Sequence, residues 1–325
     1  MNDPFQRNVD YLRISVTDRC NERCLYCMPE GYHGWERQAD HLTATELVRV
    51  VRVAAELGFR KFRLTGGEPL LRHDLVEIVQ GMHAIPGVEV IGLSTNGTRL
   101  AARAAALRAA GLRTVNISLD ALNPELYRQL TGGQVADVLA GIQAAVAAGF
   151  ERIKLNCVLM RGKNESELWP LVLFAAEHAL PLRFIELMPL SRSEVITEKH
   201  FLPVGEVMQQ LRERDNLIPR PDRRIGHGPA KYYQLERTGA LVGFIGALTN
   251  LDFCEQCNKV RLTADGKIRP CLGDHGEVDL RQALRNGASD TELQAVFTAA
   301  LRSKPKEHQF RQAYQPLRPM TAIGG

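Results

Sequence analysis

The amino-acid sequence predicts an α/β fold, a barrel or partial barrel followed by a C-terminal extension. Six β-prone runs alternate with helix-like segments in the first part of the chain, which favours a parallel sheet with right-handed crossovers. Neither a G-x-G-x-x-G motif after the first run nor a Walker lysine motif is present, which disfavours Rossmann and P-loop folds. The pattern then changes to Pro-, Arg- and Gly-rich sequence. We therefore expect the barrel in residues 1–189, and in residues 190–325 an extension that closes it.

Each expected element has a local signal. Thr43 and Glu46 have the spacing of a capping box and predict a helix that ends near Gly58. Two more helices are expected where Ala-rich sequence runs up to a glycine, at residues 101–110 and 135–148. The barrel strands are expected at residues 11–16, 61–65, 88–94, 114–119, 152–159 and 182–187. In the extension, two short strands are expected at residues 231–235 and 241–245.

Composition excludes several classes of protein. The 325 residues are 45% hydrophobic and 24% charged, close to globular averages, so the chain is neither disordered nor a coiled coil. Apolar runs are too short to cross a membrane and no targeting segment is visible, so we expect a cytoplasmic protein. The net charge of +4 fits an anionic small ligand, and without an aromatic-interleaved basic patch we expect no nucleic-acid partner.

Three cysteines follow the first expected strand in SVTDRCNERCLYCMP. Cys20, Cys24 and Cys27 form a C-x3-C-x2-C motif, which can hold three corners of a cubic iron–sulfur cluster. The fourth iron then has no ligand from this motif, and an open position is what a metal site needs to bind a reacting small molecule. A structural zinc site with a distant fourth ligand and a ferredoxin-like carrier are the alternatives.

A second group of three cysteines lies near the end of the chain. Cys254, Cys257 and Cys271 again supply three ligands rather than four. They predict a second cluster with one open iron, available to a nitrogen or oxygen of the substrate. A zinc ribbon that lacks one member and a cluster completed by a remote residue remain alternatives. Cys157 stands alone in an apolar run and is expected in the core.

Basic residues recur on the expected strands, where a buried charge is costly unless it is paired. Such residues converge on a polyanion, for example a triphosphate. Internal salt bridges to Glu68, Asp120 or Glu186 are the alternative. The basic residues concerned are Arg13, Arg63, Lys154, Arg183, Lys259 and Arg261.

The first cysteine motif, with Tyr26 before its last cysteine, resembles that of the radical S-adenosylmethionine superfamily. The segment RLTGGEPLLR, with Gly67 and Glu68, resembles the GGEP motif of the same superfamily. Glycines at the end of a strand let backbone groups approach a ligand closely, and Glu68 can support that arrangement.

Motifs along the whole chain extend the resemblance to one family within that superfamily. SVTDRCNERCLYCMP, RLTGGEPLLR, GLSTNG, NISLDAL, RFIELMPL, CEQCNKVRLTADGKIRPCLG and the terminal diglycine together resemble the GTP 3′,8-cyclase family, molybdenum cofactor biosynthesis protein A. Its most specific parts are the two three-cysteine motifs and the diglycine. The resemblance implies an incomplete (β/α)6 TIM-type barrel whose C-terminal extension carries the second cluster.

The resemblance also implies roles for individual residues. Each cysteine group would hold a [4Fe–4S] cluster, the first for S-adenosylmethionine and the second for substrate. S-adenosylmethionine would contact Tyr26, Gly67, Ser118 and Met188. GTP would contact Arg13, Arg63, Ser94, Lys154, Lys259, Val260 and Arg261. Catalysis would involve Arg13, Gly324 and Gly325.

Two of these positions depart from the family's usual residues. Ser94 stands where threonine is common and keeps the hydroxyl. Lys259 stands where arginine is common, so it keeps the charge and loses the bidentate fork. We therefore expect the phosphate contact at residue 259 to differ in detail from that of the family.

The implied reaction begins with an electron from a donor, which cleaves S-adenosylmethionine at the first cluster. The 5′-deoxyadenosyl radical takes hydrogen from C3′ of GTP, and the C3′ radical attacks C8 of guanine. The product, 3′,8-cyclo-7,8-dihydro-GTP, passes to cyclic pyranopterin monophosphate synthase. The chain would act as a monomer or homodimer. Rival hypotheses are a radical enzyme for a peptide or RNA base, and a non-enzymatic iron–sulfur or zinc scaffold.

Overall fold

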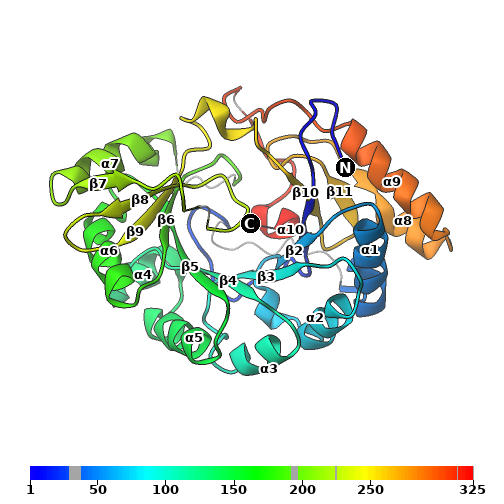
Figure 1. The fold of residues 1–325 in the computed structure, drawn as a ribbon, viewed down its shortest axis with the longest axis horizontal. Coiled ribbons are helices and arrows are strands. Elements are labelled where there is room, and N and C mark those ends of the chain that lie inside the picture. Colours follow the sequence, from blue (N-terminus) through cyan, green and yellow to red (C-terminus); the bar gives the residue numbers. More distant parts are fainter. Residues whose placement is uncertain (29–37, 192–196, 224, 313, 325) are drawn as a thin grey trace.

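The computed structural model describes residues 1–28, 38–191, 197–223, 225–312 and 314–324 (Figure 1). Twelve strands form one continuous sheet in the order β12-β11-β10-β1-β2-β3-β4-β5-β6-β9-β8-β7. The strands from β10 to β9 in this order are parallel, and antiparallel strands flank them on both sides. Within the described residues the end strands β12 and β7 do not pair with each other. The expected α/β partial barrel is confirmed.

The six expected barrel strands are present, with ends within two residues of the expected positions, and the two strands expected in the extension match as well. The strands are β1 (Tyr11–Ser15), β2 (Lys61–Thr65), β3 (Val90–Thr95), β4 (Thr114–Ser118), β5 (Arg152–Leu159), β6 (Leu182–Glu186), β7 (Leu217–Pro219), β8 (Lys231–Leu235), β9 (Leu241–Ile245), β10 (Lys259–Leu262), β11 (Lys267–Arg269) and β12 (Val278–Asp279).

Most helices cover the outside of the sheet (Figure 1). The α-helices are α1 (Ala44–Glu56), α2 (Leu75–His83), α3 (Ala104–Ala109), α4 (Pro124–Thr131), α5 (Val135–Ala147), α6 (Leu168–Glu177), α7 (Val204–Arg212), α8 (Leu280–Arg285), α9 (Asp290–Arg302) and α10 (Met320–Ile323). Short 3-10 helices are η1 (Gln38–Asp40), η2 (Pro69–Leu71), η3 (Glu165–Glu167), η4 (Glu198–His200) and η5 (Leu251–Phe253). None of the described helices is long and apolar enough to cross a lipid bilayer.

Local signals explain where the helices begin. The capping box is confirmed: the Glu46 amide donates to the Thr43 hydroxyl at 3.2 Å, and the Thr43 amide donates to the Glu46 carboxylate at 2.8 Å. Helix α3 begins at Ala104, later than expected. The reason is tertiary, because the Arg103 guanidinium donates to three backbone carbonyls of residues 70, 72 and 73 and holds the preceding chain in a turn.

Successive side chains along a strand face two different environments. Leu12 and Ile14 of β1 belong to the hydrophobic core between sheet and helices, as does Phe62 of β2. The intervening residues, Arg13 and Arg63, therefore face the inside of the barrel. Strands β1 and β2 thus carry apolar side chains outward to the core and the two arginines inward. Cys157 is fully buried in the same core, as expected.

The C-terminal extension adds strands to both edges of the barrel. Strands β9, β8 and β7 continue the sheet beyond β6, whereas β10, β11 and β12 continue it beyond β1. One sheet therefore runs through both parts of the chain. The exact division at residue 189 stays a prediction.

The C-terminal helix lies inside the barrel, where Figure 1 shows α10 at its centre. Ile323 is buried in a small apolar cluster with Leu190, Phe310 and Tyr314, and Met320 packs against it. This cluster is separate from the main core, and it anchors the end of the chain within the space that the barrel strands surround.

Candidate functional site

The two cysteine groups lie at opposite ends of the barrel. Cys20 and the rest of its group follow the C-terminal end of β1. Cys254 and Cys257 precede the N-terminal end of β10, which is parallel to β1. Cys271 follows β11, which is antiparallel to β10 and therefore returns the chain to the same end. The barrel interior lies between the two groups.

The first group is a compact set of free thiols. The Cys27 amide donates to the Cys24 carbonyl at 3.0 Å, and no cysteine of the group forms a disulfide. Burial raises the pKa of Cys20 and Cys27 to about 12, and Glu22 and Glu68 reinforce the effect at Cys20. Thiolates there need a positive counter-charge, which iron supplies, so this set fits an iron–sulfur cluster.

The GGEP segment packs directly against the cysteine loop. The Gly67 amide donates to the Thr17 carbonyl at 2.8 Å, and the Glu68 amide donates to the Arg19 carbonyl at 2.7 Å. A Cβ at Gly67 would lie 2.3 Å from the Arg19 oxygen, so only glycine fits. The glycine is thus required for packing against the cysteine loop, and the expected approach to a ligand stays a prediction.

Glu68 is a structural link rather than a partner of a basic residue. Its carboxylate, 1% exposed, accepts hydrogen bonds from the Leu70 amide, the Thr95 hydroxyl and the Asn96 amide at 2.7–2.9 Å. Burial raises the pKa of Glu68 to about 7. The carboxylate therefore joins the ends of β2 and β3 beside the cysteine loop.

The residues expected to bind S-adenosylmethionine gather at the C-terminal end of the barrel. The Tyr26 hydroxyl donates to Asp120 at 2.9 Å, which ties the cysteine loop to the segment after β4. Ser118 is the last residue of β4, Gly67 follows β2, and Met188 follows β6. Parallel strands end at the same edge, so these positions surround the mouth at which the first cysteine group lies.

Positively charged side chains lie close to the second group of cysteines. Cys257 is 3.5 Å from the Lys304 ammonium, and its amide donates to the Cys254 carbonyl at 3.1 Å. Burial raises the pKa of Cys257, but Lys304 and Lys259 outweigh it, so the pKa lies below its usual value. Burial raises the pKa of Cys254 and Cys271, so Cys257 is the member of the group that favours the thiolate form. Three free thiols beside a buried ammonium fit a second iron–sulfur cluster. Among the described residues, no group of three His, Cys, Asp or Glu side chains is placed to hold a single metal ion.

The basic residues inside the barrel form rows across neighbouring strands. Arg261 of β10 pairs in register with Arg13 of β1, and Arg13 pairs with Arg63 of β2. On the other side Arg261 pairs with Arg269 of β11. Paired residues on adjacent strands point to the same face, so four guanidinium groups converge in the interior. Burial lowers the pKa of Arg13 to about 10.

A second row brings Lys154 to the same interior. Ser94 of β3 pairs in register with Asn116 of β4, and Asn116 pairs with Lys154 of β5. The Lys154 ammonium donates to the Ile225 carbonyl at 3.3 Å. Burial lowers the pKa of Lys154 to about 6, and Arg183, Arg63 and Arg152 add to the shift.

Arg269 forms an ion pair with Glu277, and the three carboxylates considered from the sequence have other partners. Glu68 is bonded as described above, Asp120 accepts from Tyr26 and the Val158 amide, and Glu186 accepts from amides and a hydroxyl of residues 204–249. These three carboxylates therefore have backbone amides and hydroxyl groups as hydrogen-bond partners. Internal salt bridges stay an alternative for the basic residues of the barrel interior.

Hydrogen bonds to neutral acceptors hold the arginines in place. Arg63 donates to the Tyr11 hydroxyl at 2.5 Å, to the Leu93 carbonyl at 2.7 Å and to the Thr114 hydroxyl at 3.0 Å. Arg183 donates twice to the Asn156 side chain, at 2.8 and 2.5 Å. Neutral acceptors orient the guanidinium groups and leave their charge available to an anion.

Val260 is expected to contact GTP, but its side chain points away from the barrel interior. It is 1% exposed and lies in the hydrophobic core on the outer side of the sheet, opposite Lys259 and Arg261. Only its backbone can face the interior. The Lys259 ammonium lies 5.7 Å from the centre of the Tyr11 ring and donates to the Asn258 side chain at 3.0 Å.

The C-terminal tail reaches the basic row. Arg261 donates a hydrogen bond to the Gly324 carbonyl. A Cβ at Gly324 would lie 2.7 Å from Thr65 Cγ2 at the end of β2, and φ is +76° there. The tail therefore joins the basic row to the mouth that holds the first cysteine group. Gly325 lies outside the described residues.

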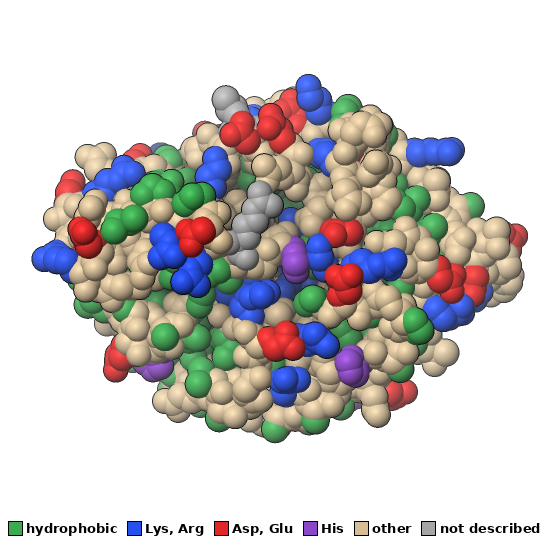
Figure 2. All heavy atoms as spheres, viewed as in Figure 1, with side chains coloured by type: hydrophobic (Ala, Val, Ile, Leu, Met, Phe, Trp, Pro, Cys, Tyr) green, Lys and Arg blue, Asp and Glu red, His purple; other side chains and the backbone are tan. Residues whose placement is uncertain are grey.

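A cavity of about 840 Å³ opens at the N-terminal end of the barrel. Lys61, Arg220 and His227 line it, and the face in Figure 2 shows Lys and Arg side chains around a central hollow. Ile225 and Gly226 line the cavity too, and a Cβ at Gly226 would lie 2.6 Å from the Lys154 nitrogen. The segment between β7 and β8 thus separates this cavity from the inner basic rows.

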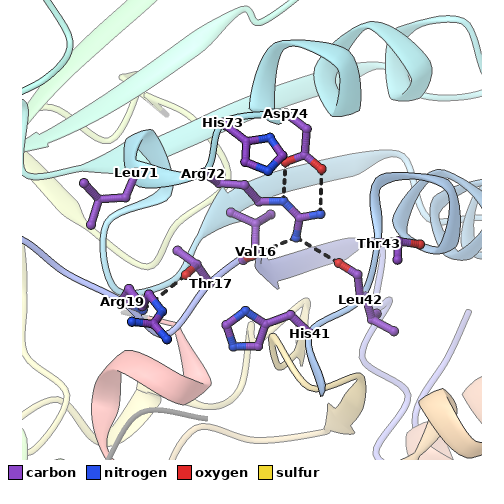
Figure 3. A pocket seen from close by; sticks show the side chains of 10 residues that line it. All are labelled: Val16, Thr17, Arg19, His41, Leu42, Thr43, Leu71, Arg72, His73 and Asp74. Atoms are coloured by element: carbon purple, nitrogen blue, oxygen red, sulfur yellow. Dashed lines mark hydrogen bonds and ion pairs between the residues drawn. The ribbon is translucent and has the colours of Figure 1, made fainter. Parts of the chain in front are cut away.

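A smaller cavity of about 240 Å³ lies beside the first cysteine loop (Figure 3). Its central group is Arg72, which donates twice to Asp74 at 2.6 and 3.0 Å and to the carbonyls of Val16 and Leu42 at 2.8 and 2.9 Å. These bonds tie the end of β1 to η2. The cavity is a structural junction rather than part of the expected site.

Three residues at the site were not expected. Tyr11 is two positions before Arg13 on the same face of β1, so strand alternation could have found it. His227 lies 6.4 Å from the Tyr11 ring, and Lys304 contacts the second cysteine group. Neither has a local sequence signal, because both reach the site only through tertiary folding.

Comparison with known proteins agrees with this geometry. Residues 14–175 match the family model of the radical SAM superfamily, and residues 180–310 match that of Molybdenum Cofactor Synthesis C. The chain is 43% identical over 326 residues to a protein of Pelotomaculum thermopropionicum and 44% identical over 326 residues to one of Moorella thermoacetica. Both are named GTP 3′,8-cyclase, and each match covers 100% of both chains.

Solved structures share the fold at low sequence identity. Streptococcus suis SuiB bound to S-adenosylmethionine is 15% identical, with a TM-score of 0.59 over 84% of this chain and 63% of that one. The enzyme anSMEcpe with bound AdoMet is 16% identical, with a TM-score of 0.56 over 92% of this chain and 82% of that one. These two show the fold alone. With its full-length relatives, the chain belongs to the GTP 3′,8-cyclase family of the radical S-adenosylmethionine superfamily.

Proposed function

We propose that this chain converts GTP to 3′,8-cyclo-7,8-dihydro-GTP, the first step in molybdenum cofactor biosynthesis. The observation that carries the proposal is the set of buried arginines and lysines inside the barrel, between two groups of three free cysteines. Such a set suits a polyphosphate, because a highly charged anion offsets the cost of burying several cations. The names of the full-length relatives support guanosine as the nucleoside.

The cysteines would hold two [4Fe–4S] clusters, the first with Cys20, Cys24 and Cys27 and the second with the other three. Once bound, such a cluster would supply the electron for reductive cleavage of S-adenosylmethionine. Tyr26 and Gly67, both beside the first cysteine group, would contact that molecule. Ser118 and Met188 complete the set at the ends of β4 and β6.

The chain's own residues bind and orient the nucleotide. Arg13, Arg63 and Arg261 lie in one row and would grip the phosphates, while Lys154 and Ser94 lie in the next row. Fixing the phosphates fixes the ribose relative to the first cluster, because the row and the mouth are on the same strands. Guanine would then face the second cysteine group at the opposite end.

The tail would exclude water from the reaction. Gly324 packs against Thr65 at the end of β2, and the apolar cluster around Ile323 holds α10 within the barrel. A radical intermediate needs such shelter, since water and stray hydrogen donors would quench it. We extend this role to Gly325, and we assign to Arg13 a part in catalysis beyond binding.

Partners and location follow as proposals. The enzyme requires an electron donor, and its product passes to cyclic pyranopterin monophosphate synthase. We propose a monomer or homodimer. Seven free cysteines support a reducing compartment and hence the cytoplasm, because thiols persist where disulfides are reduced.

The decisive experiment offers the enzyme four nucleotides. The anaerobically reconstituted, reduced protein is incubated with S-adenosylmethionine and GTP, ATP, CTP or UTP, and 5′-deoxyadenosine and the nucleotide product are measured. We expect deoxyadenosine and a cyclised nucleotide with GTP, and only slow uncoupled cleavage with the other three.

Two results would contradict the proposal. Equal deoxyadenosine with all four nucleotides and no cyclised product would show that GTP is not the substrate. Reconstituted protein with one zinc and no iron would exclude radical chemistry altogether.

A further inference from the structure

Lys304 is a buried cation beside the second cysteine group. Its side chain is 3% exposed and follows α9, far from the cysteines in sequence. The ammonium lies 3.5 Å from Cys257 Sγ and donates to the carbonyls of Lys259 and Pro270 at 2.8 and 2.6 Å. These three contacts use all three of its N–H donors.

The two carbonyls lie on the two chain segments that carry the cysteines. Lys259 is two residues after Cys257, and Pro270 is the residue before Cys271. The Lys304 ammonium therefore joins the start of β10 to the end of β11 at the point where the cysteines must converge. Its removal would loosen the register of one segment against the other.

The charge of Lys304 needs an explanation, because a buried ammonium is costly unless an opposite charge offsets it. Among the described residues, no carboxylate forms an ion pair with Lys304. The remaining neighbour is the sulfur of Cys257, and an iron–sulfur core held by three thiolates carries net negative charge. The cluster would thus be the counter-charge of Lys304.

We propose that Lys304 is a positioning residue for the second cluster, where its ammonium holds the two cysteine segments together and raises the reduction potential of the cluster. The inference rests on the second cluster of the proposed function. Hydrogen bonds to cluster sulfurs and nearby positive charge both favour the reduced, more negative state, so both act in this direction.

Other cations near the cysteines reach backbone atoms rather than sulfur. At the first group, Arg23 donates to the Cys20 carbonyl at 2.8 Å. At the second group, Arg7 donates to the Cys254 carbonyl at 2.9 Å. Lys304 instead contacts the Cys257 sulfur itself, which is the atom that would bind iron.

The test is a redox titration of the full-length protein with both clusters loaded, followed by electron paramagnetic resonance. A chain with Cys20, Cys24 and Cys27 all replaced by Ala identifies the signal of the second cluster. In Lys304→Met we expect the equilibrium constant for reduction of that cluster to fall at least tenfold. For a one-electron couple, this makes the reduction potential more negative by about 59 mV. The potential of the first cluster should not change.

Three further variants separate charge from shape. Lys306→Met removes an exposed lysine two residues away and should leave both potentials unchanged. Lys304→Arg keeps the charge and should stay nearer to the wild-type potential than Lys304→Met. Lys304→Gln keeps a donor without the charge and should fall with Lys304→Met.

The outcomes distinguish this inference from the proposed function. If the wild-type chain holds only the first cluster, the proposed function itself fails. If the second cluster forms and its potential is the same in the wild type, Lys304→Met and Lys304→Gln, the function stands and the role of Lys304 is wrong. If Lys304→Met does not load its second cluster, the potentials of Lys304→Gln and Lys304→Arg are compared instead. A lower potential in Lys304→Gln supports the role of Lys304, and equal potentials contradict it.

Discussion

At the scale of single residues, the position of Arg261 in the sheet and one hydrogen bond of its guanidinium define the site. It lies in register with Arg13 on the neighbouring strand, and it donates to the Gly324 carbonyl. Burial lowers the pKa of Arg261 well below its usual value, and Arg13 adds to the shift. An anion between these groups would offset the repulsion, which is why the site favours a polyphosphate over a neutral ligand.

We expect Arg261→Ala to raise the KM for GTP by about tenfold to a hundredfold, because a buried charge-assisted contact is lost. The KM for S-adenosylmethionine should change much less. Steady-state kinetics at varied concentrations of each substrate check this. Arg49→Ala, which breaks a surface ion pair with Asp290, is the control. A larger effect on S-adenosylmethionine than on GTP would show that Arg261 is assigned to the wrong ligand.

Lys154 predicts a pH dependence. Its pKa is lowered to about 6, first by burial and then by Arg183, Arg63 and Arg152, so the free enzyme holds it largely neutral at pH 7.5. A phosphate beside the amine favours the charged form and raises this pKa. Binding of GTP should therefore take up a proton, and affinity should fall as the pH rises from about 6 to about 8.

Calorimetry in two buffers of different ionisation heat measures this uptake. Lys154→Met should lose most of it, and the remainder reports other groups near the site, among them His227, whose pKa burial and Lys61 lower to about 4. Proton release on binding, or an uptake that Lys154→Met leaves unchanged, would contradict the assignment.

At the scale of elements, β10 decides how the site is built. It has four residues, Lys259–Leu262, and it pairs with β1 although about 250 residues separate them. This pairing brings Lys259 and Arg261 beside Arg13 and carries the second cysteine group to the N-terminal end of the barrel. A strand this short has no reliable pattern in sequence, because its partner supplies the stability that its own residues lack.

The two C-terminal glycines are expected to affect catalysis but not stability. Deleting Gly324 and Gly325 should lower the rate of GTP cyclisation by about tenfold or more, because water then reaches the reacting groups. The Tm should change by less than about 2 °C, since Ile323 and Met320 still anchor α10 in its apolar cluster. Product analysis and thermal unfolding of the same preparation check both.

An unchanged cyclisation rate in the deletion variant would assign no part in catalysis to the tail. Cleavage of S-adenosylmethionine in the absence of GTP serves as the internal control, because the residues around the first cysteine group remain intact.

At the scale of the whole molecule, the barrel keeps two cysteine groups apart. Each group depends on a different part of the chain: a single loop after β1 carries the first, and two segments that meet only in the folded protein carry the second. The interior between them holds the basic rows. Damage to one end should therefore leave the other end functional.

We expect Cys254→Ala to reduce the iron content from about eight to about four atoms per chain. The variant should still cleave S-adenosylmethionine but should not form the cyclised nucleotide, because the substrate end has lost its cluster. Iron analysis, deoxyadenosine and product are measured together. Retained cyclisation would falsify the role of the second group in binding substrate.

The cysteine motifs, the GGEP segment and the six barrel strands could all be predicted from the sequence, because each is a local pattern or a spacing of a few residues. Arg13, Arg63 and Lys154 could be singled out for the same reason, since a charge on an apolar strand is conspicuous. Local patterns also placed the capping box of α1.

Only the tertiary structure decided which of these groups meet. It placed Lys304 against Cys257, turned the Val260 side chain to the core and brought Gly324 to Arg261. It also showed that the extension widens both edges of one sheet. The physical reason is that these contacts join residues far apart in sequence, and their geometry follows from strand register and packing rather than from any local preference.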